Sequence, residues 1–302
     1  MKTLNLVYPD KSNIKYKISK FPDGQQQVVI EALTLDIFAS NNSKHSVEII
    51  SRLNNFMDLE LILCATKALK RLGVKEIDLY VPYILGARSD RKFEIGSTSY
   101  LCDIIAPILN SQNYRNITVI DPHSHVMEAV FHNLVIYNNS DLVKWVLSNE
   151  PFCGKSLDDI ILVSPDAGAS HKIYKLAEQI GYKGDIITCS KERDTEGKLT
   201  KCIVPWEEEY FGKDLIIVDD ICDGGATFVN ISKELKELTR DFSSPKIYLI
   251  VTHGIFSKGF GELNKYFDVI YTTNSYQDLN PNDLSNLGNK HLGDFIKQLN
   301  IF

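Results

Sequence analysis

The chain has 302 residues, enough for about two compact domains with cores of their own, which excludes a small scaffold that depends on disulfides or metals. Hydrophobic residues make up 44% and charged residues 24%, and no uninterrupted apolar run approaches the roughly 18 residues that span a bilayer. Acidic residues outnumber basic ones, 39 to 33, so the basic excess typical of nucleic-acid binding is missing. Composition predicts a soluble folded protein without a nucleic-acid or membrane partner.

The N-terminus and the cysteines both predict a cytoplasmic protein. Asp10 and Lys11 interrupt the first short apolar patch, which therefore does not resemble a signal peptide. The cysteines contain no C-x-x-C pair, and a chain of this length needs no disulfide staples. We expect reduced core residues at Cys64, Cys102, Cys153, Cys189, Cys202 and Cys222.

Short β-rich runs alternate with longer helical patterns, which is typical of α/β units with a largely parallel sheet. Strands are predicted at 77–83, 117–121, 160–164, 185–188, 215–219, 247–252 and 269–272. Helices are predicted at 55–72, ending at Gly73, and at 97–109, 170–180 and 228–238. Polar and turn-forming residues around 138–140 and 151–155 place a boundary near residue 145, giving domains 1–145 and 146–302.

The most informative segment is 215–227, where an apolar strand runs into Asp219 and Asp220 and then into a turn with Gly224 and Gly225. Such a turn can direct consecutive backbone N–H groups at an anion, and the following helix adds the positive end of its dipole. Carboxylates at this strand end can reach ribose hydroxyls or a Mg²⁺ ion that bridges to substrate oxygens. The same residues also suit an acidic strand end with an ordinary turn, because Asp and Gly are common turn residues.

The run 218–227 (Val-Asp-Asp-Ile-Cys-Asp-Gly-Gly-Ala-Thr) resembles the phosphoribosyl pyrophosphate loop of type I phosphoribosyltransferases and ribose-phosphate pyrophosphokinases. Other segments resemble the pyrophosphokinase pattern in the same order, namely 21–24, 88–92, 121–123, 164–168, 191–193, 252–256 and 273–275. Because these matches are colinear, the chain is identified as a member of the ribose-phosphate pyrophosphokinase family. No G-x-x-x-x-G-K-[ST] loop is present, so an ordinary P-loop kinase is not supported.

The resemblance implies an α/β fold of two phosphoribosyltransferase-like (type I) domains, each a mostly parallel sheet flanked by helices. It implies Mg²⁺-dependent transfer of the β,γ-diphosphoryl group of ATP to the anomeric hydroxyl of ribose 5-phosphate, giving phosphoribosyl pyrophosphate and AMP. Catalysis then rests on alignment and charge stabilisation rather than covalent chemistry. Family members commonly form hexamers, so a homo-oligomer, either a dimer or a hexamer, is expected.

The ATP-binding residues that the resemblance implies are Phe21, Asp23, Gln25, Arg88, Ser89, Asp90 and Arg91. Phe21 would stack near adenine, Asp23 would accept from its amino group, and Arg88 would meet the polyphosphate. Gln25 stands where many members have Glu, and Ser89 replaces a frequent Gln. Apart from the resemblance, the charged run 88–92 also suits a solvated surface.

His123, after the strand predicted at 117–121, occupies a position that the family uses near the Mg²⁺ of MgATP. The resemblance therefore implies a catalytic and metal-binding role, although a lone His also suits an ordinary core or surface position. Asp166, at another strand end, is predicted to bind metal directly or through water. Its alternative is a turn residue before the helix predicted at 170–180, where Asp is common.

The implied sugar-phosphate residues are Asp219, Asp220, Asp223, Gly224, Gly225, Ala226 and Thr227. Lys191 and Arg193 are the implied catalytic cations. They begin a polar stretch that extends to Thr200 and suits a mobile lid, and their alternating spacing would let an extended loop direct both at one phosphate chain. The alternative is a surface loop with ion pairs worth less than about 1 kcal/mol each.

Three alternatives to the implied reaction remain open. Gly224 stands where many members have Thr, and a roomier pocket would admit ADP-ribose, giving ADP-ribose pyrophosphate for NAD salvage. A phosphoribosyltransferase needs only one phosphate-loop domain, which leaves the ATP-like segments unexplained. A non-catalytic regulatory homologue has no physical reason to retain Lys191, Arg193, His123 and the acidic pair together.

Overall fold

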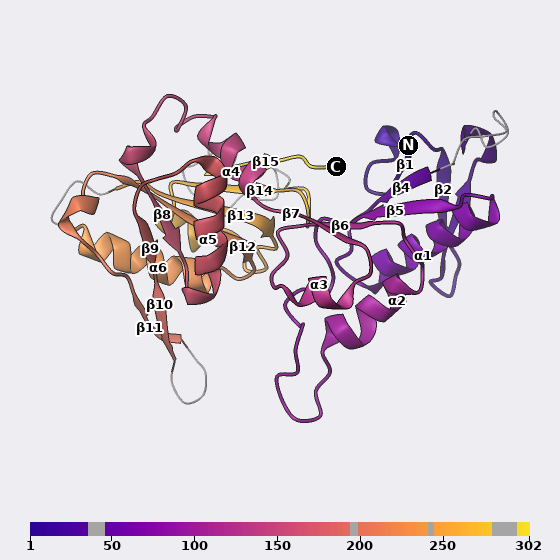
Figure 1. Ribbon diagram of the computed structural model, residues 1–302, viewed down its shortest axis with the longest axis horizontal. Helices are drawn as coiled ribbons and strands as arrows, with labels where there is room; N and C mark the ends of the chain where they lie inside the picture. The colour runs from indigo at the N-terminus through magenta and orange to yellow at the C-terminus, as the bar shows by residue number, and fades with distance from the viewer. Residues whose placement is uncertain (36–45, 194–198, 241–244, 280–294) are drawn as a thin grey trace. The chain divides into compact units, whose positions relative to one another are not determined.

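The computed structural model describes residues 1–35, 46–193, 199–240, 245–279 and 295–302 (Figure 1). The chain divides into two compact units, with residues 1–138 and Phe302 in unit 1 and residues 139–301 in unit 2. The boundary predicted near residue 145 lies inside helix α4 (Ser140–Leu147), which is part of unit 2. The reason is packing, because Leu142, Val143 and Val146 of this helix are buried in a core cluster of unit 2.

Unit 1 contains a five-stranded parallel sheet in the order β1-β4-β5-β6-β7. Its strands are β1 (Lys2–Asn5), β4 (Ser46–Ile50), β5 (Glu76–Tyr80), β6 (Ile117–Ile120) and β7 (Leu134–Tyr137). A separate antiparallel hairpin is formed by β2 (Tyr16–Lys20) and β3 (Gln26–Ile30). The helices are α1 (Phe56–Arg71), α2 (Ala106–Asn110) and α3 (Val126–Val130), with short helical turns η1 (Pro9–Lys11), η2 (Ala32–Leu35) and η3 (Leu101–Ile105).

Helix α1 confirms the prediction at 55–72. The Asn55 side chain caps it by accepting from the Met57 and Asp58 amides at 2.8 and 3.1 Å. At the other end Gly73 has φ +90°, and the Val74 amide donates to the Leu69 carbonyl, which closes the helix as a left-handed C-terminal turn. No helix in the described ranges has the length and apolar character needed to cross a membrane.

The prediction of one continuous α-helix at 97–109 is wrong, because this segment contains two shorter helical elements of different type. The π-helical turn η3 precedes α2, and a proline lies in the first turn of α2. Proline has no backbone N–H to donate to the preceding turn, so the hydrogen-bond pattern changes at this point.

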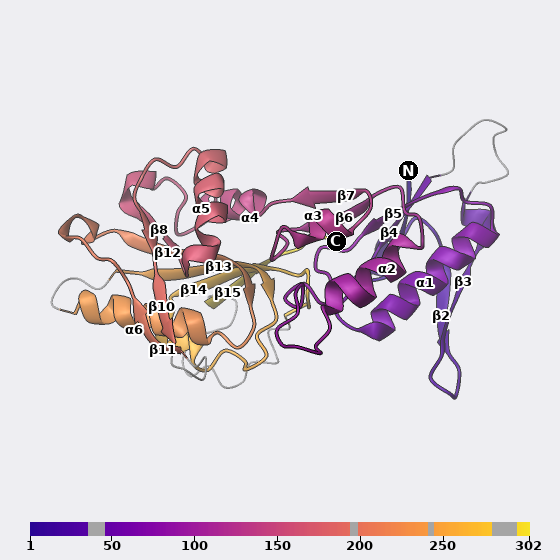
Figure 2. The same cartoon turned by 60° about the horizontal axis from the view of Figure 1, so that its bottom comes forward.

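Unit 2 contains a six-stranded parallel sheet in the order β15-β14-β13-β12-β8-β9. Its strands are β8 (Ile160–Ser164), β9 (Ile186–Thr188), β12 (Asp214–Cys222), β13 (Ile247–Gly254), β14 (Val269–Thr273) and β15 (Ile296–Leu299). Its helices are α4, α5 (Ala167–Ile180), α6 (Ala226–Leu238) and α7 (Leu263–Tyr266), with turns η4 (Leu157–Asp159) and η5 (Glu208–Tyr210). Helices α4 and α5 lie on one face of the sheet and α6 on the other (Figure 2). The predicted fold class is confirmed in both units.

The strand order of unit 2 changes direction between β8 and β12. From β8 the chain proceeds to β9 at one edge, and it then returns to β12 on the other side of β8. Open α/β sheets bind ligands outside the carboxyl ends of the strands at such a point. Asp166 follows β8, and Asp219 and Asp220 lie near the end of β12, so the fold brings three predicted site residues to this position.

The polar stretch after β9 is a β-ribbon, and its prediction as a loop is wrong for the described residues. Strand β10 (Ser190–Arg193) pairs antiparallel with β11 (Leu199–Ile203), with Lys191 opposite Cys202 and an irregular register after Glu192. Pairing satisfies backbone groups that a loop would leave to water. The rest of the predicted lid, residues 194–198, lies outside the described residues.

All six cysteines are free, but they are not all core residues. Cys189, Cys202 and Cys222 are buried, and Cys64 and Cys102 are partly buried. Cys153 is exposed, so the prediction of a core position is wrong there. It lies in a turn after α4, in which its amide donates to the Asn149 carbonyl at 3.0 Å.

Candidate functional site

The turn between β12 and α6 has the backbone geometry of an anion site. Gly225, the N-cap of α6, has φ +77° and provides no side-chain cap. By contrast, the N-terminus of α5 is capped by Asp166, whose Oδ1 accepts from the Ala169 amide at 3.0 Å. The helix dipole and the first amides of α6 therefore remain available to an anionic ligand at the switch point of the sheet.

We expect Gly225→Ala to destabilise unit 2 and to impair this turn. A Cβ at Gly225 would lie 2.9 Å from Leu263 Cδ2, on a backbone already in the left-handed region. Strain and overpacking together should lower the free energy of unfolding by about 2 kcal/mol or more, measurable by urea denaturation.

Gly224→Ala is the matched control for that loss of stability. A Cβ at Gly224 meets only flexible side-chain carbons of Lys258, at 3.3–3.5 Å. Its cost should stay below about 1 kcal/mol. Equal unfolding free energies for the two variants would contradict the assigned backbone geometry.

Asp219 and Asp220 form a carboxylate pair at the end of β12. Asp220 is 4% exposed, and its Oδ2 lies 2.8 Å from Nζ of Lys172 on α5. Burial raises the pKa of Asp219 well above its ordinary value, and the Asp220 and Asp166 carboxylates raise it further. The Asp220 amide, which donates to Asp219 Oδ1 at 2.9 Å, and the Lys172 ammonium oppose this shift in pKa. The site therefore holds a carboxylate that a bound cation or hydroxyl donors would stabilise.

A loop after β13 supports the remaining part of the turn. Ser257 Oγ donates to Asp223 Oδ1 at 2.5 Å, and its amide donates to the Asp223 carbonyl at 3.2 Å. The stem of Lys258 lies beside Gly224. Sequence reasoning missed Lys172, Ser257 and Lys258. In the sequence, Lys172 lies within the predicted helix 170–180 and Ser257 directly follows the segment 252–256. Neither position by itself predicts contact with the turn.

Two further segments that carry the family resemblance brace the sheet. Thr273 Oγ1 donates to the Thr252 carbonyl at 2.7 Å, and Ser275 Oγ lies 3.2 Å from the same carbonyl and 2.8 Å from Nδ1 of His253. His253 and Ser275 are both buried. These residues tie β14 to β13, the strand that pairs with β12, and so support the strand that carries the carboxylates.

In unit 1, the adenine-binding candidates lie at the tip of the β2–β3 hairpin. The Phe21 amide donates to the Gln25 carbonyl at 2.8 Å, and Asp23 Oδ1 accepts from the Gln25 amide at 3.2 Å. The Phe21 side chain is 46% exposed, so its ring is accessible for stacking.

The loop with Arg88, Ser89, Asp90 and Arg91 follows β5, and the turn with His123 follows the neighbouring strand β6. Because these strands are parallel, the loop and the turn leave the same edge of the sheet. Arg88 and His123 are exposed. Figures 1 and 2 draw the hairpin tip away from this edge, so the loop and the His123 turn leave the sheet at one edge and the hairpin tip lies elsewhere in unit 1.

Asp121 marks the His123 turn as conformationally strained. It is 4% exposed and has φ +43°, and its amide donates to the Tyr137 carbonyl at 2.7 Å. A non-glycine residue in this region costs of order 1–3 kcal/mol, and such residues cluster at functional sites. The strain supports a functional turn here.

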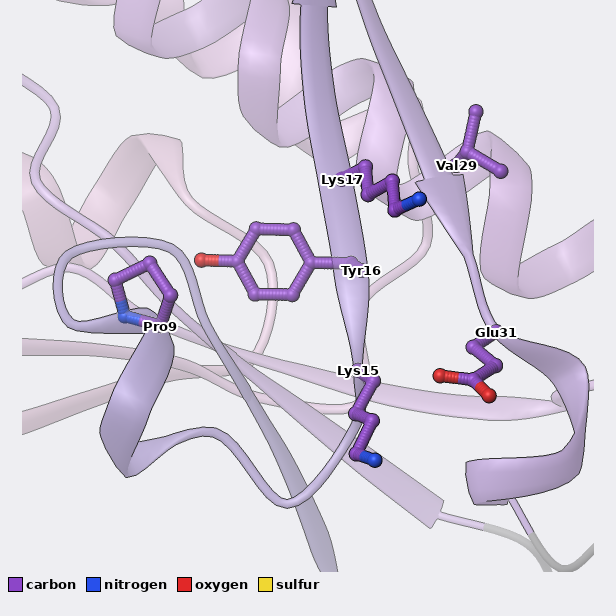
Figure 3. Close-up of a pocket in the computed structure, with 6 residues that line it drawn as sticks. All are labelled: Pro9, Lys15, Tyr16, Lys17, Val29 and Glu31. Atoms are coloured by element: carbon purple, nitrogen blue, oxygen red, sulfur yellow. The ribbon is translucent and has the colours of Figure 1, made fainter.

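A cavity of about 540 Å³ lies beside the base of the hairpin, lined by Pro9, Lys15, Tyr16, Lys17, Val29 and Glu31 (Figure 3). None of these is a predicted site residue. The Tyr16 hydroxyl already donates to the Asn5 carbonyl at 2.5 Å. This cavity is therefore separate from the candidate site.

The described residues contain no group of three or more His, Cys, Asp or Glu side chains arranged to hold a metal ion. Mg²⁺ commonly binds through only one or two carboxylates, with waters and substrate phosphates completing its shell. The carboxylate oxygens of the partly buried Asp219 and the buried Asp220 fit that mode, because they are adjacent oxygen ligands of the type that Mg²⁺ prefers.

Comparisons with known proteins agree with this architecture. The chain is 31% identical over 242 residues to the ribose-phosphate pyrophosphokinase of Mycoplasmopsis pulmonis, covering 80% of this chain and 69% of that protein. It is 28% identical over 235 residues to the enzyme of the same name from Thermosipho africanus, covering 75% and 68%. A scan of protein-family models finds no match.

The fold has a solved counterpart. A crystal structure of phosphoribosylpyrophosphate synthetase from Mycobacterium smegmatis aligns with a TM-score of 0.72 at 19% identity, covering 97% of this chain and 88% of that chain. At this identity the likeness concerns the fold, and it extends over both units.

Proposed function

This chain belongs to the ribose-phosphate pyrophosphokinase family of transferases, and we propose that it transfers the β,γ-diphosphoryl group of MgATP to the anomeric hydroxyl of ribose 5-phosphate. The products are phosphoribosyl pyrophosphate and AMP. The observation that carries the proposal is the α6 N-terminus, preceded by Gly224 and Gly225, at the switch point of the unit 2 sheet. It is the kind of backbone site that binds a sugar phosphate.

In unit 2, we assign sugar binding to the turn. The amides of Ala226 and Thr227 bind the 5-phosphate, and the carboxylates of Asp219 and Asp220 accept from the ribose hydroxyls. Ser257 holds Asp223 in place through its hydroxyl. These contacts orient the anomeric oxygen, and orientation is the main source of catalysis in this reaction class.

Asp219, Asp220, Asp166 and His123 are the groups that we propose for holding Mg²⁺. When bound, Mg²⁺ neutralises charge on the ATP phosphates and on the transferring group. Asp166 already caps α5, so its contribution through water is more compatible with the structure than direct ligation.

Lys191 and Arg193 in β10 are proposed to stabilise the negative charge that develops on the transferring group. The structure describes their backbone in the β10–β11 ribbon. Their assignment as catalytic cations rests on the family resemblance of the segment 191–193.

In unit 1, we assign the adenine to Phe21, Asp23 and Gln25, and the polyphosphate to the loop of Arg88, Ser89, Asp90 and Arg91. The separation of the hairpin tip from that loop within one chain supports a homo-oligomer, a dimer or a hexamer, in which two copies complete one ATP site. The proposal also places the enzyme in the cytoplasm, with no nucleic-acid or membrane partner.

The reaction type can be tested by separating the nucleotide products. Protein, MgATP and ribose 5-phosphate are incubated together, and nucleotides are resolved by chromatography. AMP formed only in the presence of the sugar phosphate is the expected result. ADP in place of AMP would falsify the proposed diphosphoryl transfer. Absence of any ATP consumption would favour a phosphoribosyltransferase or a regulatory homologue.

ADP-ribose remains the second candidate acceptor, because Gly224 leaves no side chain of its own at the turn. Competition decides between the two. With MgATP and equimolar ribose 5-phosphate and ADP-ribose, we expect the initial rate of ribose 5-phosphate diphosphorylation to be higher. A large preference for ADP-ribose would change the substrate and leave the reaction type standing.

A further inference from the structure

Lys258 occupies the space beside the phosphate turn that a side chain at residue 224 would fill. Three consecutive carbons of its stem, Cγ, Cδ and Cε, lie 3.3–3.5 Å from the Cβ position of Gly224. Nζ is one bond beyond Cε, so the ammonium lies within about 5 Å of that position. Lys258 is exposed, and it makes no ion pair or hydrogen bond with another residue among the described parts of the chain.

The loop that carries Lys258 is fixed to the same strand end. The amides of Ile255 and Phe256 both donate to the Cys222 carbonyl, at 2.9 and 3.1 Å. The Ser257 amide and hydroxyl both bond Asp223. Residues 255–257 are therefore held against the turn by backbone and side-chain hydrogen bonds, and they place the adjoining Lys258 beside it.

Phe256 adds a second sign that this placement is functional. It has φ +48°, a conformation that is strained for a large side chain, and its ring is 5% exposed and packs 4.7 Å from that of Phe260. Such strain persists only where surrounding packing enforces it, and it is typical of ligand-binding loops. The strained residue directs the chain so that Ser257 and Lys258 follow over the turn.

The carboxylates near the turn would oppose the binding of a phosphate, and a neighbouring cation would offset this repulsion. Asp219, Asp220 and Asp223 lie within five residues of one another along the chain, and Lys172 is paired with Asp220 at 2.8 Å. A phosphate monoester dianion placed at the α6 N-terminus would experience repulsion from these carboxylates. The Lys258 ammonium is positioned to offset it, and a charge-assisted bond to phosphate is stronger than a neutral one.

We propose that Lys258 is a substrate-binding residue that contacts the 5-phosphate of the sugar and takes the place of a side chain at residue 224. The inference rests on the proposed function and specifies its substrate. Because the Lys258 stem fills the room left by Gly224, the turn favours a terminal phosphate monoester. A phosphate that continues into a second group, as in ADP-ribose, carries less charge and needs the occupied space.

The test compares Lys258→Met, which keeps the stem and removes the charge, with Lys258→Arg, which keeps the charge. Lys258→Met should raise the KM for ribose 5-phosphate by about 10- to 100-fold, as expected for loss of a bond to a charged group, with the KM for ATP unchanged. Lys258→Arg should restore most of the affinity. Lys183→Ala is the matched control, an exposed lysine beyond the C-terminal end of α5, and should match wild type.

A double mutant tests the shared space. Gly224→Thr places a side chain where the Lys258 stem now lies, so Lys258→Met should have a much smaller effect on KM in the Gly224→Thr background. If Lys258→Met raises KM equally with Gly and with Thr at position 224, Lys258 does not take the place of a side chain at residue 224, and that part of the proposal is overturned.

Calorimetric titration with ribose 5-phosphate separates the two proposals. Wild-type protein that binds the sugar phosphate but forms no AMP contradicts the proposed reaction, and weaker binding by Lys258→Met would still support the Lys258 contact. Wild-type and Lys258→Met proteins with equal Kd and KM values for ribose 5-phosphate would overturn the Lys258 assignment, whatever the product.

Discussion

Asp219→Asn is expected to reduce turnover by about 10²–10³-fold while it raises the Tm of the ligand-free protein at neutral pH. The two effects have one cause. Burial and the carboxylates of Asp220 and Asp166 disfavour the ionised form of Asp219, and Asn removes the charge without changing the shape. Substrate binding should weaken more for the sugar than for ATP, because Asp219 belongs to the unit 2 turn. Steady-state kinetics and thermal melts measure both effects.

The pH dependence of the Tm gain identifies its cause. The pKa of Asp219 is raised in the folded protein above the value of about 3.9 for an unfolded chain, so folding favours its protonated form. The stabilising contribution of protonated Asp219 is fully present below the pKa that this group has in the unfolded chain. It is lost as the pH rises through the higher pKa of Asp219 in the folded protein. The Tm advantage of Asp219→Asn should therefore be larger at pH 8 than at pH 5. An advantage that does not change with pH would contradict the assignment of charge burial as the cause.

Asp214→Asn is the control at the opposite end of β12. Asp214 Oδ2 lies 2.5 Å from Nζ of Lys155, far from the switch point. This variant should lose up to about 1 kcal/mol of stability, and its turnover should be unchanged. Equal losses of turnover in the two variants would indicate a general defect of the strand.

Lys191→Ala and Arg193→Ala are each expected to lower kcat by about 10²–10³-fold with little change in the affinity for ATP. Their charges should matter most when negative charge develops on the transferring group, so the loss appears in kcat. Pre-steady-state measurement of the chemical step would separate this effect from slower product release.

The control for that loss is Lys213→Ala. Lys213 pairs with Asp185 at 3.5 Å, near the start of β12, and its removal should leave kcat unchanged. Near-normal turnover in both Lys191→Ala and Arg193→Ala would remove these residues from the mechanism and leave the β10–β11 ribbon as a surface element.

The elements with complete local signals could be predicted from the sequence. Helix α1 has its cap at Asn55 and its terminating Gly73, and β12 contains the apolar run 215–218 followed directly by Asp219 and Asp220. Strand β2 lacked such a signal, because four of its five residues are exposed and its pattern does not alternate clearly. Strands β1, β7 and β15 are short and have mixed burial, so they were missed for the same reason.

The turn at 219–227 was predictable because its residues are consecutive. The contacts that complete it were not, because they depend on the register of the sheet. Lys172 reaches Asp220 because β8 pairs with β12, and Lys258 reaches Gly224 because β13 pairs with β12 on the other side. The pairing register of these strands cannot be predicted from the spacing of residues along the sequence.

The measurement that tests the account most directly is phosphorus NMR of the reaction of MgATP with ribose 5-phosphate. Transfer of the diphosphoryl group as one unit predicts that the β and γ signals of ATP disappear together and that an AMP signal and a coupled pair of sugar diphosphate signals appear in equal amounts. The account would be contradicted by ADP signals, or by a product in which the anomeric oxygen has gained one phosphate instead of a diphosphate.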